Sequence, residues 1–78
     1  MIEVLLYGNV KKLVRNNIPK ANTILLFEYI EGEHFQDLLN RLGLKLDDVG
    51  DCYINNNPAI PEDVIHDSDT IELNQIQS

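Results

Sequence analysis

A single strong helical pattern in the middle of the chain is flanked by apolar segments that are too short for helices. Its apolar residues recur at i, i+3, i+4 and i+7, the spacing of one helix face: Phe35, Leu38, Leu39 and Leu42. Gly43 follows, at the position where helices commonly end in a left-handed residue. A 78-residue chain with one main helix and several strands is expected to form a sheet packed on that helix, an α+β architecture.

Four segments have the composition of strands. They are Ile2–Tyr7, Thr23–Ile30, Cys52–Ile54 and a last segment from Thr70 to about Gln75. After the third segment, an asparagine run at positions 55–57 tolerates positive φ, so we expect a tight hairpin there. Its returning half, Pro58–Ile60, is expected to be short and at an edge, because proline cannot donate to a ladder. If the first and last strands are parallel neighbours at the sheet centre, the arrangement is the β-grasp.

Two shorter elements are expected between these strands. Val10, Leu13 and Val14 recur at i, i+3 and i+4, which predicts a short helix with Asn9 as its N-cap. The segment Pro61–Ile65 is expected to form one helical turn opened by its proline.

The composition limits the function classes. Thirteen acidic residues against six Lys and Arg give a net charge of −7, which argues against a nucleic-acid backbone as the main partner. A lone cysteine, Cys52, excludes an intrachain disulfide and a cysteine-based zinc cluster. No apolar run approaches the roughly 20 residues needed to span a bilayer. We therefore expect residues 1–78 to form a single cytoplasmic domain without a membrane partner.

One segment departs from this acidic character. Lys11, Lys12, Arg15 and Lys20 lie within ten residues that contain no acid, so this segment carries +4 against −11 for the remainder. It is a candidate docking patch for an acidic partner. A solvated helix face and loop is the simpler alternative, and a small nucleic-acid-associated domain with salt-sensitive binding is another.

The chain shows no motif for catalysis or metal binding. His34 and His66 stand near acids, but at none of the established metal-ligand spacings. Cys52 has no histidine at a spacing that predicts activation, and we interpret it as a core or sheet residue. Phosphate-binding glycine loops and nucleophile elbows are also absent from the sequence. We expect neither enzymatic activity nor a metal or cofactor.

The order and spacing of the segments resemble the ubiquitin-like sulfur carriers MoaD and ThiS. Four stretches take the place of family motifs: Val4–Val14, Phe35–Gly43, Tyr53–Asn56 and Asp67–Ile71. The resemblance covers essentially the whole chain. It implies a ubiquitin-like β-grasp fold, with a mixed four- to five-stranded sheet packed on one main helix.

The resemblance also implies a role. In these carriers the last strand continues into a Gly-Gly tail, whose carboxylate is adenylated by an E1-like enzyme and converted to a thiocarboxylate. Here the last glycine is Gly50, and the tail Gln77-Ser78 lacks the two glycines. The leading hypothesis is a non-catalytic module that binds another protein. The alternative is a sulfur carrier of the molybdopterin, thiamine or tRNA-thiolation type with a truncated or atypical tail, whose partner would be an E1-like or MoaE/ThiG-like enzyme.

Family members dock on partner enzymes through apolar residues on the sheet face away from the helix. The sheet-face candidates for this role are Leu6, Ile54 and Leu73. Ile76 is a further candidate for partner binding, and Gln77 and Ser78 form the C-terminal tail. The alternative is that strand alternation places most of these side chains under the helix. A register error of one residue would invert the assignment.

Overall fold

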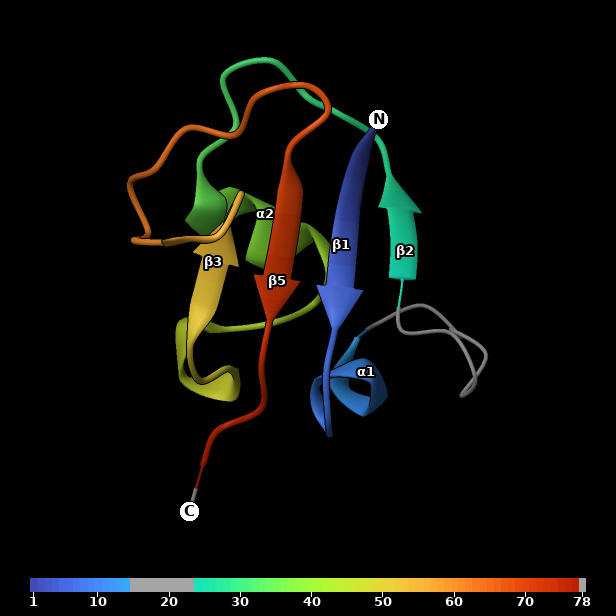
Figure 1. Cartoon of the computed structure of the whole chain (residues 1–78), viewed down its shortest axis with the longest axis vertical. Coiled ribbons are helices and arrows are strands. Elements are labelled where there is room, and N and C mark those ends of the chain that lie inside the picture. The colour runs from blue at the N-terminus through green and yellow to red at the C-terminus, as the bar shows by residue number, and fades with distance from the viewer. Residues whose placement is uncertain (15–23, 78) are drawn as a thin grey trace.

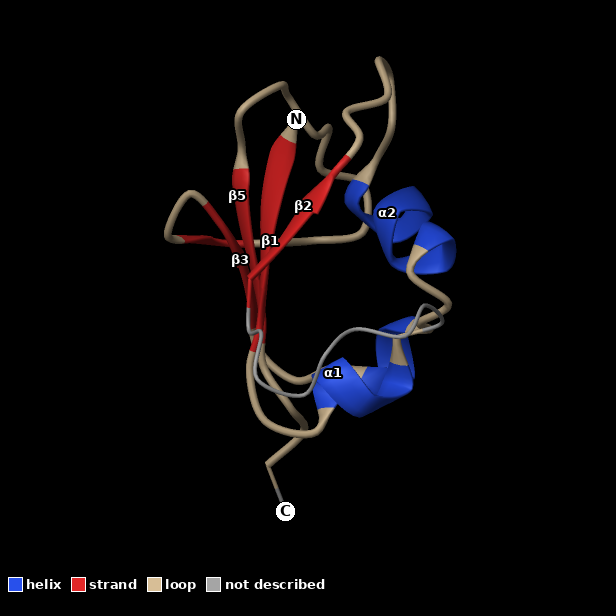
Figure 2. Cartoon of the chain, turned by 90° about the vertical axis from the view of Figure 1, so that its right-hand side faces the viewer, coloured by secondary structure: helices blue, strands red, loops and turns tan. Residues whose placement is uncertain are grey.

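A five-stranded mixed sheet carries two α-helices on one of its faces, as Figure 1 and Figure 2 show. The computed structural model describes residues 1–14 and 24–77. Its strands are β1 (Ile2–Leu6), β2 (Ile24–Phe27), β3 (Cys52–Ile54), β4 (Asn57–Pro58) and β5 (Thr70–Leu73). Its helices are α1 (Val10–Leu13), α2 (Phe35–Arg41) and the 3₁₀ helix η1 (Leu46–Asp48). The predicted α+β class and mixed sheet are confirmed.

The strand order in the sheet is β2-β1-β5-β3-β4. β1 and β5 run parallel, and every other neighbouring pair is antiparallel. The first and last strands of the described chain thus lie side by side in the middle of the sheet (Figure 1).

The core lies between this sheet and the helices. The four apolar residues of the helical pattern, Phe35, Leu38, Leu39 and Leu42, are at most 1% exposed. Facing them from the sheet are the buried residues of the two central strands, Ile2, Val4, Leu6, Ile71 and Leu73. Gly43 has φ +82°, so α2 ends in the left-handed residue that the sequence predicts.

The β3–β4 hairpin has the predicted tight turn. Ile54 pairs with Asn57, and the two residues between them, Asn55 and Asn56, have φ values of 51° and 70°. Positive φ at both central positions is the signature of a type I′ turn. The returning strand therefore begins at Asn57, one residue earlier than predicted, because that residue is already paired.

A second turn, before β5, is tied to this hairpin through Asn55. The Nδ2 of Asn55 donates to Asp69 Oδ1 over 2.8 Å, and its Oδ1 accepts from the backbone N–H of Thr70 over 2.9 Å. Asp69 is buried, and its other carboxylate oxygen accepts from the backbone N–H of His66 over 2.7 Å. These contacts fix the point at which β5 begins.

Ser68→Gly is expected to stabilise the protein by about 0.5–1 kcal/mol. Ser68 adopts φ +69°, a conformation that costs an L-residue about 1–2 kcal/mol and that glycine adopts freely. Glycine loses more backbone entropy on folding, so the net gain is smaller than this cost. Urea unfolding followed by circular dichroism measures the change. Ser68→Ala is the control, because it keeps the strain and should not stabilise; equal midpoints for the two variants would contradict the strain argument.

Residues 61–65 do not form the predicted helical turn. The carbonyls of Pro61 and Asp63 instead accept the backbone N–H groups of Gln36 and Phe35, over 3.1 Å and 2.7 Å. These donors belong to the first turn of α2, whose N–H groups have no partner inside the helix. The prediction was wrong because this segment satisfies another helix instead of forming its own.

Three smaller predictions also differ from the structure. Asn9 makes no side-chain cap to α1, and its backbone N–H donates to Gln75 Oε1 over 2.8 Å. Of the three apolar residues in the predicted helical pattern, Val10 and Val14 are buried in the core, whereas Leu13 is 48% exposed. β2 spans Ile24–Phe27, so residues 28–30 of the predicted strand Thr23–Ile30 are not part of it. Thr23 lies outside the described residues.

Candidate docking surface

The expectation that Leu6, Ile54 and Leu73 lie on the sheet face away from the helices is wrong. Leu6 and Leu73 are 0% exposed and belong to the core, and Ile54 packs against that core. The register pairs Leu6 with Leu73, so both side chains point to the same side, beneath the helices. The alternative prediction, that strand alternation places these side chains under the helices, is therefore the correct one.

The residues that alternate with these along the strands form the other face of the sheet, here called the open face. Residues paired across strands share a face, and one row crosses the whole sheet: Ile24, Leu5, Glu72, Tyr53 and Pro58. A second row holds Leu26, Glu3 and Thr70. Figure 2 shows both helices on the opposite side of the sheet.

Three apolar or aromatic side chains on the open face are well exposed. Ile24 is 54% exposed, Leu26 is 61% exposed and Tyr7, just after β1, is 41% exposed. None of these three belongs to the core, whereas Leu25 and Phe27 in the same strand pack against it. β2 therefore presents two apolar residues to each side of the sheet.

The charged residues of the sheet are all acidic. The five strands contain Glu3 and Glu72 but no lysine, arginine or histidine. In the described part of the chain, lysine and arginine occur only in α1, in α2 and in the loop after α2, at Lys11, Lys12, Arg41 and Lys45. The open face is thus acidic and apolar.

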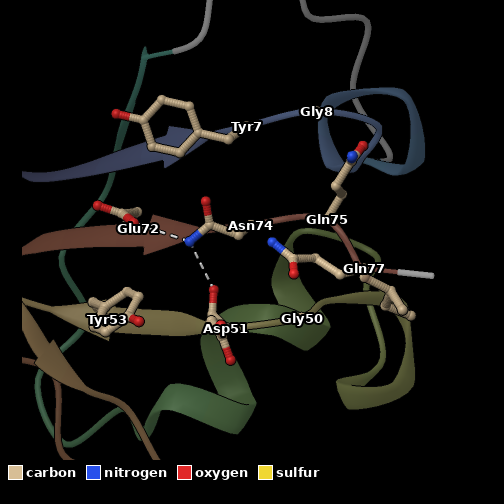
Figure 3. A pocket seen from close by; sticks show the side chains of 10 residues that line it. Tyr7, Gly8, Gly50, Asp51, Tyr53, Glu72, Asn74, Gln75 and Gln77 are labelled. Atoms are coloured by element: carbon tan, nitrogen blue, oxygen red, sulfur yellow. Dashed lines mark hydrogen bonds between the residues drawn. The ribbon is translucent and has the colours of Figure 1, made fainter.

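A cavity of about 770 Å³ lies at the end of this face, where β5 ends. Figure 3 shows Tyr7 on one side of Glu72 and Asn74, and Tyr53 with Asp51 on the other. The Nδ2 of Asn74 donates to Glu72 Oε2 and to the Asp51 carbonyl, both over 2.9 Å. Asn74 thereby orients the Glu72 carboxylate between two aromatic rings.

The segment after β5 forms the remaining wall of the cavity. Gln75, Ile76 and Gln77 line it together with Gly8 and Gly50. The backbone N–H of Gly50 donates to the Asn74 carbonyl over 2.8 Å. Among the predicted partner-binding residues, Ile76 is 55% exposed and Gln77 is also exposed, so both remain available for contacts.

Of the predicted basic segment, the two described residues, Lys11 and Lys12, are not on the open face. Lys11 is half-buried and Lys12 exposed, and both lie in α1, on the helix side of the sheet (Figure 2). Arg15, Lys20 and the tail residue Ser78 lie outside the described residues.

Cys52 is a half-buried thiol next to the cavity. Burial raises its pKa from the usual 9.0 to about 11; a backbone hydrogen bond from Asn74 opposes the shift, and the nearby negative charges of Asp51 and Glu72 add to it. Its Sγ contacts the Gly50 carbonyl at 3.5 Å. A thiol with so high a pKa is a poor nucleophile at neutral pH.

Cys52 is expected to react with iodoacetamide at pH 8 about a hundredfold more slowly in the folded protein than in urea. A pKa raised from 9.0 to about 11 lowers the thiolate fraction by this factor. The raised pKa also makes stability depend on pH. The Cys52 thiol keeps its proton to a higher pH in the folded state than in the unfolded state, so the free energy of unfolding falls as the pH rises from 9.0 towards 11. Mass spectrometry of timed samples gives both rates, and equal rates would contradict the raised pKa.

The two histidines take part in local contacts of turns and helix starts. His34 Nδ1 lies 3.4 Å from Asp37 Oδ2, and His66 Nδ1 lies 3.9 Å from Asp69 Oδ2. Across residues 1–14 and 24–77, no three His, Cys, Asp or Glu side chains gather in a way that would hold a metal ion.

One signal in the sequence would have identified the open face. A carboxylate at a central strand position must face water, so Glu3 places Leu5 and Tyr7 on the solvent side, and Glu72 places Ile71 and Leu73 in the core. The rule of two-residue alternation then assigns both strands without any structure.

Comparisons with known proteins do not extend this description. No family model, no curated protein and no solved structure matches the chain. No helix in the described ranges is long and apolar enough to cross a membrane.

Proposed function

We propose that the chain is a ubiquitin-like β-grasp protein of the MoaD/ThiS type and acts as a non-catalytic protein-interaction module. The fold is supported by the parallel pairing of β1 with β5 at the sheet centre and by the helices gathered on one face. A half-buried thiol that is free and holds its proton fits a reducing compartment such as the cytoplasm.

The observation that supports docking is the exposure of Ile24, Leu26 and Tyr7 on one sheet face. Each of these side chains points away from the core, so folding gains little from its apolar surface. Apolar residues gathered on one exposed face, beside polar ones, are typical of protein contact surfaces. The protein partner therefore binds across β2 and β1.

This proposal predicts that Leu26→Ser abolishes capture of a protein partner by the immobilised full chain. The control is Ile60→Ser, because Ile60 has a similar exposed fraction, 54% against 61% for Leu26, but lies in the loop after β4. Quantitative mass spectrometry compares the captured proteins. A partner kept by Ile60→Ser and lost by Leu26→Ser supports the proposal, whereas partners kept equally by both variants would exclude the open face.

A further inference from the structure

We propose that the partner of the open face presents a basic, partly apolar segment, and that one of its arginine or lysine side chains enters the cavity between Tyr7 and Tyr53. This inference rests on the proposed function and specifies the chemistry of the partner.

The first argument is charge. The strands of the open face carry carboxylates and no cationic residue, and the whole chain has a net charge of −7. Complementary charge steers association and excludes partners of like charge. An acidic partner would bring further carboxylates towards Glu3 and Glu72, which disfavours it.

The second argument is the chemistry of the cavity wall. Tyr7 and Tyr53 offer aromatic rings on two sides, with the Glu72 carboxylate between them (Figure 3), and Asp51 also lines the cavity. A cation near an aromatic ring is attracted by the ring quadrupole, and a guanidinium also donates several hydrogen bonds to carboxylates. The hydrogen bond from Asn74 holds the Glu72 carboxylate in place before a ligand arrives.

The third argument is spacing. In the row that crosses the sheet, Glu72 and Ile24 are separated by β1, so two strand spacings of about 4.8 Å place them roughly 10 Å apart. A peptide in the polyproline II conformation covers about 9 Å in three residues, and its three residues per turn point residues i and i+3 to the same side. A segment with an apolar residue and an arginine three positions later therefore matches both the apolar residues of β2 and the cavity.

The test is a titration of the full ¹⁵N-labelled chain with a short peptide of two Leu-Ser-Ser-Arg repeats, followed by NMR. We expect shifts at Tyr7, Tyr53, Glu72 and Asn74, and weaker binding as salt is added. Glu72→Gln should weaken binding about five- to tenfold, the usual effect of one charge contact of this kind. The glutamine oxygen can still accept from Asn74, so the cavity wall keeps its shape.

Glu62→Gln is the matched control. Glu62 is exposed and lies in the loop between β4 and β5, so the variant removes the same charge away from the open face and should change binding less than about twofold. Equal weakening by the two variants would overturn a specific cation site.

Control peptides separate this inference from the proposed function. If glutamate replaces arginine in the peptide and the affinity is unchanged, the basic partner is excluded while the open face remains a docking surface. If neither peptide shifts any resonance of the open face, the basic partner is overturned as well; the open face itself is then judged by the Leu26→Ser capture experiment. Shifts confined to α1 or to residues 60–64 would likewise contradict the inference.

Discussion

Glu33→Ala is expected to lower the free energy of unfolding by about 3 kcal/mol, the low end of the cost of breaking a buried ion pair. The Glu33 side chain is 4% exposed and Arg41 is 23% exposed. Both carboxylate oxygens accept from the Arg41 guanidinium, each over 2.7 Å. Removal of the carboxylate leaves a largely buried cation without its counter-charge.

Arg41 also joins three parts of the fold. Its guanidinium donates to the Glu28 carbonyl over 2.7 Å and lies 4.3 Å from the centre of the Phe27 ring. It therefore holds the end of β2 and the loop before α2 against the last turn of that helix. A domain of this size has a total stability of only about 4–12 kcal/mol, so the expected loss is a large part of it.

The control for this prediction is the double variant Glu33→Leu with Arg41→Leu. Because both charges are removed together, no uncompensated charge stays buried, and we expect this variant to be more stable than Glu33→Ala. Urea unfolding followed by far-ultraviolet circular dichroism is the suitable measurement, since the chain has no tryptophan. A loss below about 1 kcal/mol for Glu33→Ala would show that the pair behaves as a surface salt bridge.

The sequence predicts α2 and the hairpin because local chemistry decides them. The apolar spacing of α2, its Gly43 and the two-residue Asn55-Asn56 turn depend on neighbouring residues only. By contrast, the contact of the Arg41 side chain with Glu33, eight positions earlier, depends on the tertiary fold.

The faces of β2 and the fate of residues 61–65 depend on tertiary partners. In β1 the carboxylate of Glu3 assigns Leu5 to the open face, but β2 contains only apolar residues, so only the packing of the helices decides which of them are buried. The cavity is lined by residues just after β1, by β3 and the residues before it, and by β5 and the segment after it, which are distant in sequence. Its residue types carry no motif, so the sequence alone gave no indication of it.

Gly50→Ala is expected to lower the free energy of unfolding by about 2 kcal/mol, within the usual range for an added group in a tightly packed place. A Cβ at this position would lie 2.5 Å from the Gln75 carbonyl oxygen and 3.2 Å from the Ile76 Cα. Both are backbone atoms, so no side-chain rotation relieves the clash. The segment after β5 has to move, and the 2.8 Å hydrogen bond from Gly50 N–H to the Asn74 carbonyl is strained or lost.

The displacement also bears on binding, because this segment forms a wall of the cavity. Gly50→Ala should shift the NMR signals of Gln75 to Gln77 and weaken the binding of the arginine peptide, while the NMR signals of α2 stay unchanged. Gly32→Ala is the contrasting control: a Cβ there has open space within 4 Å, but φ is +82°, so its cost of about 1–2 kcal/mol is purely conformational. It should leave the cavity and the peptide affinity intact. If Gly50→Ala kept the stability, the signals and the affinity of the original chain, the close approach of the two backbones would not be what positions the cavity wall.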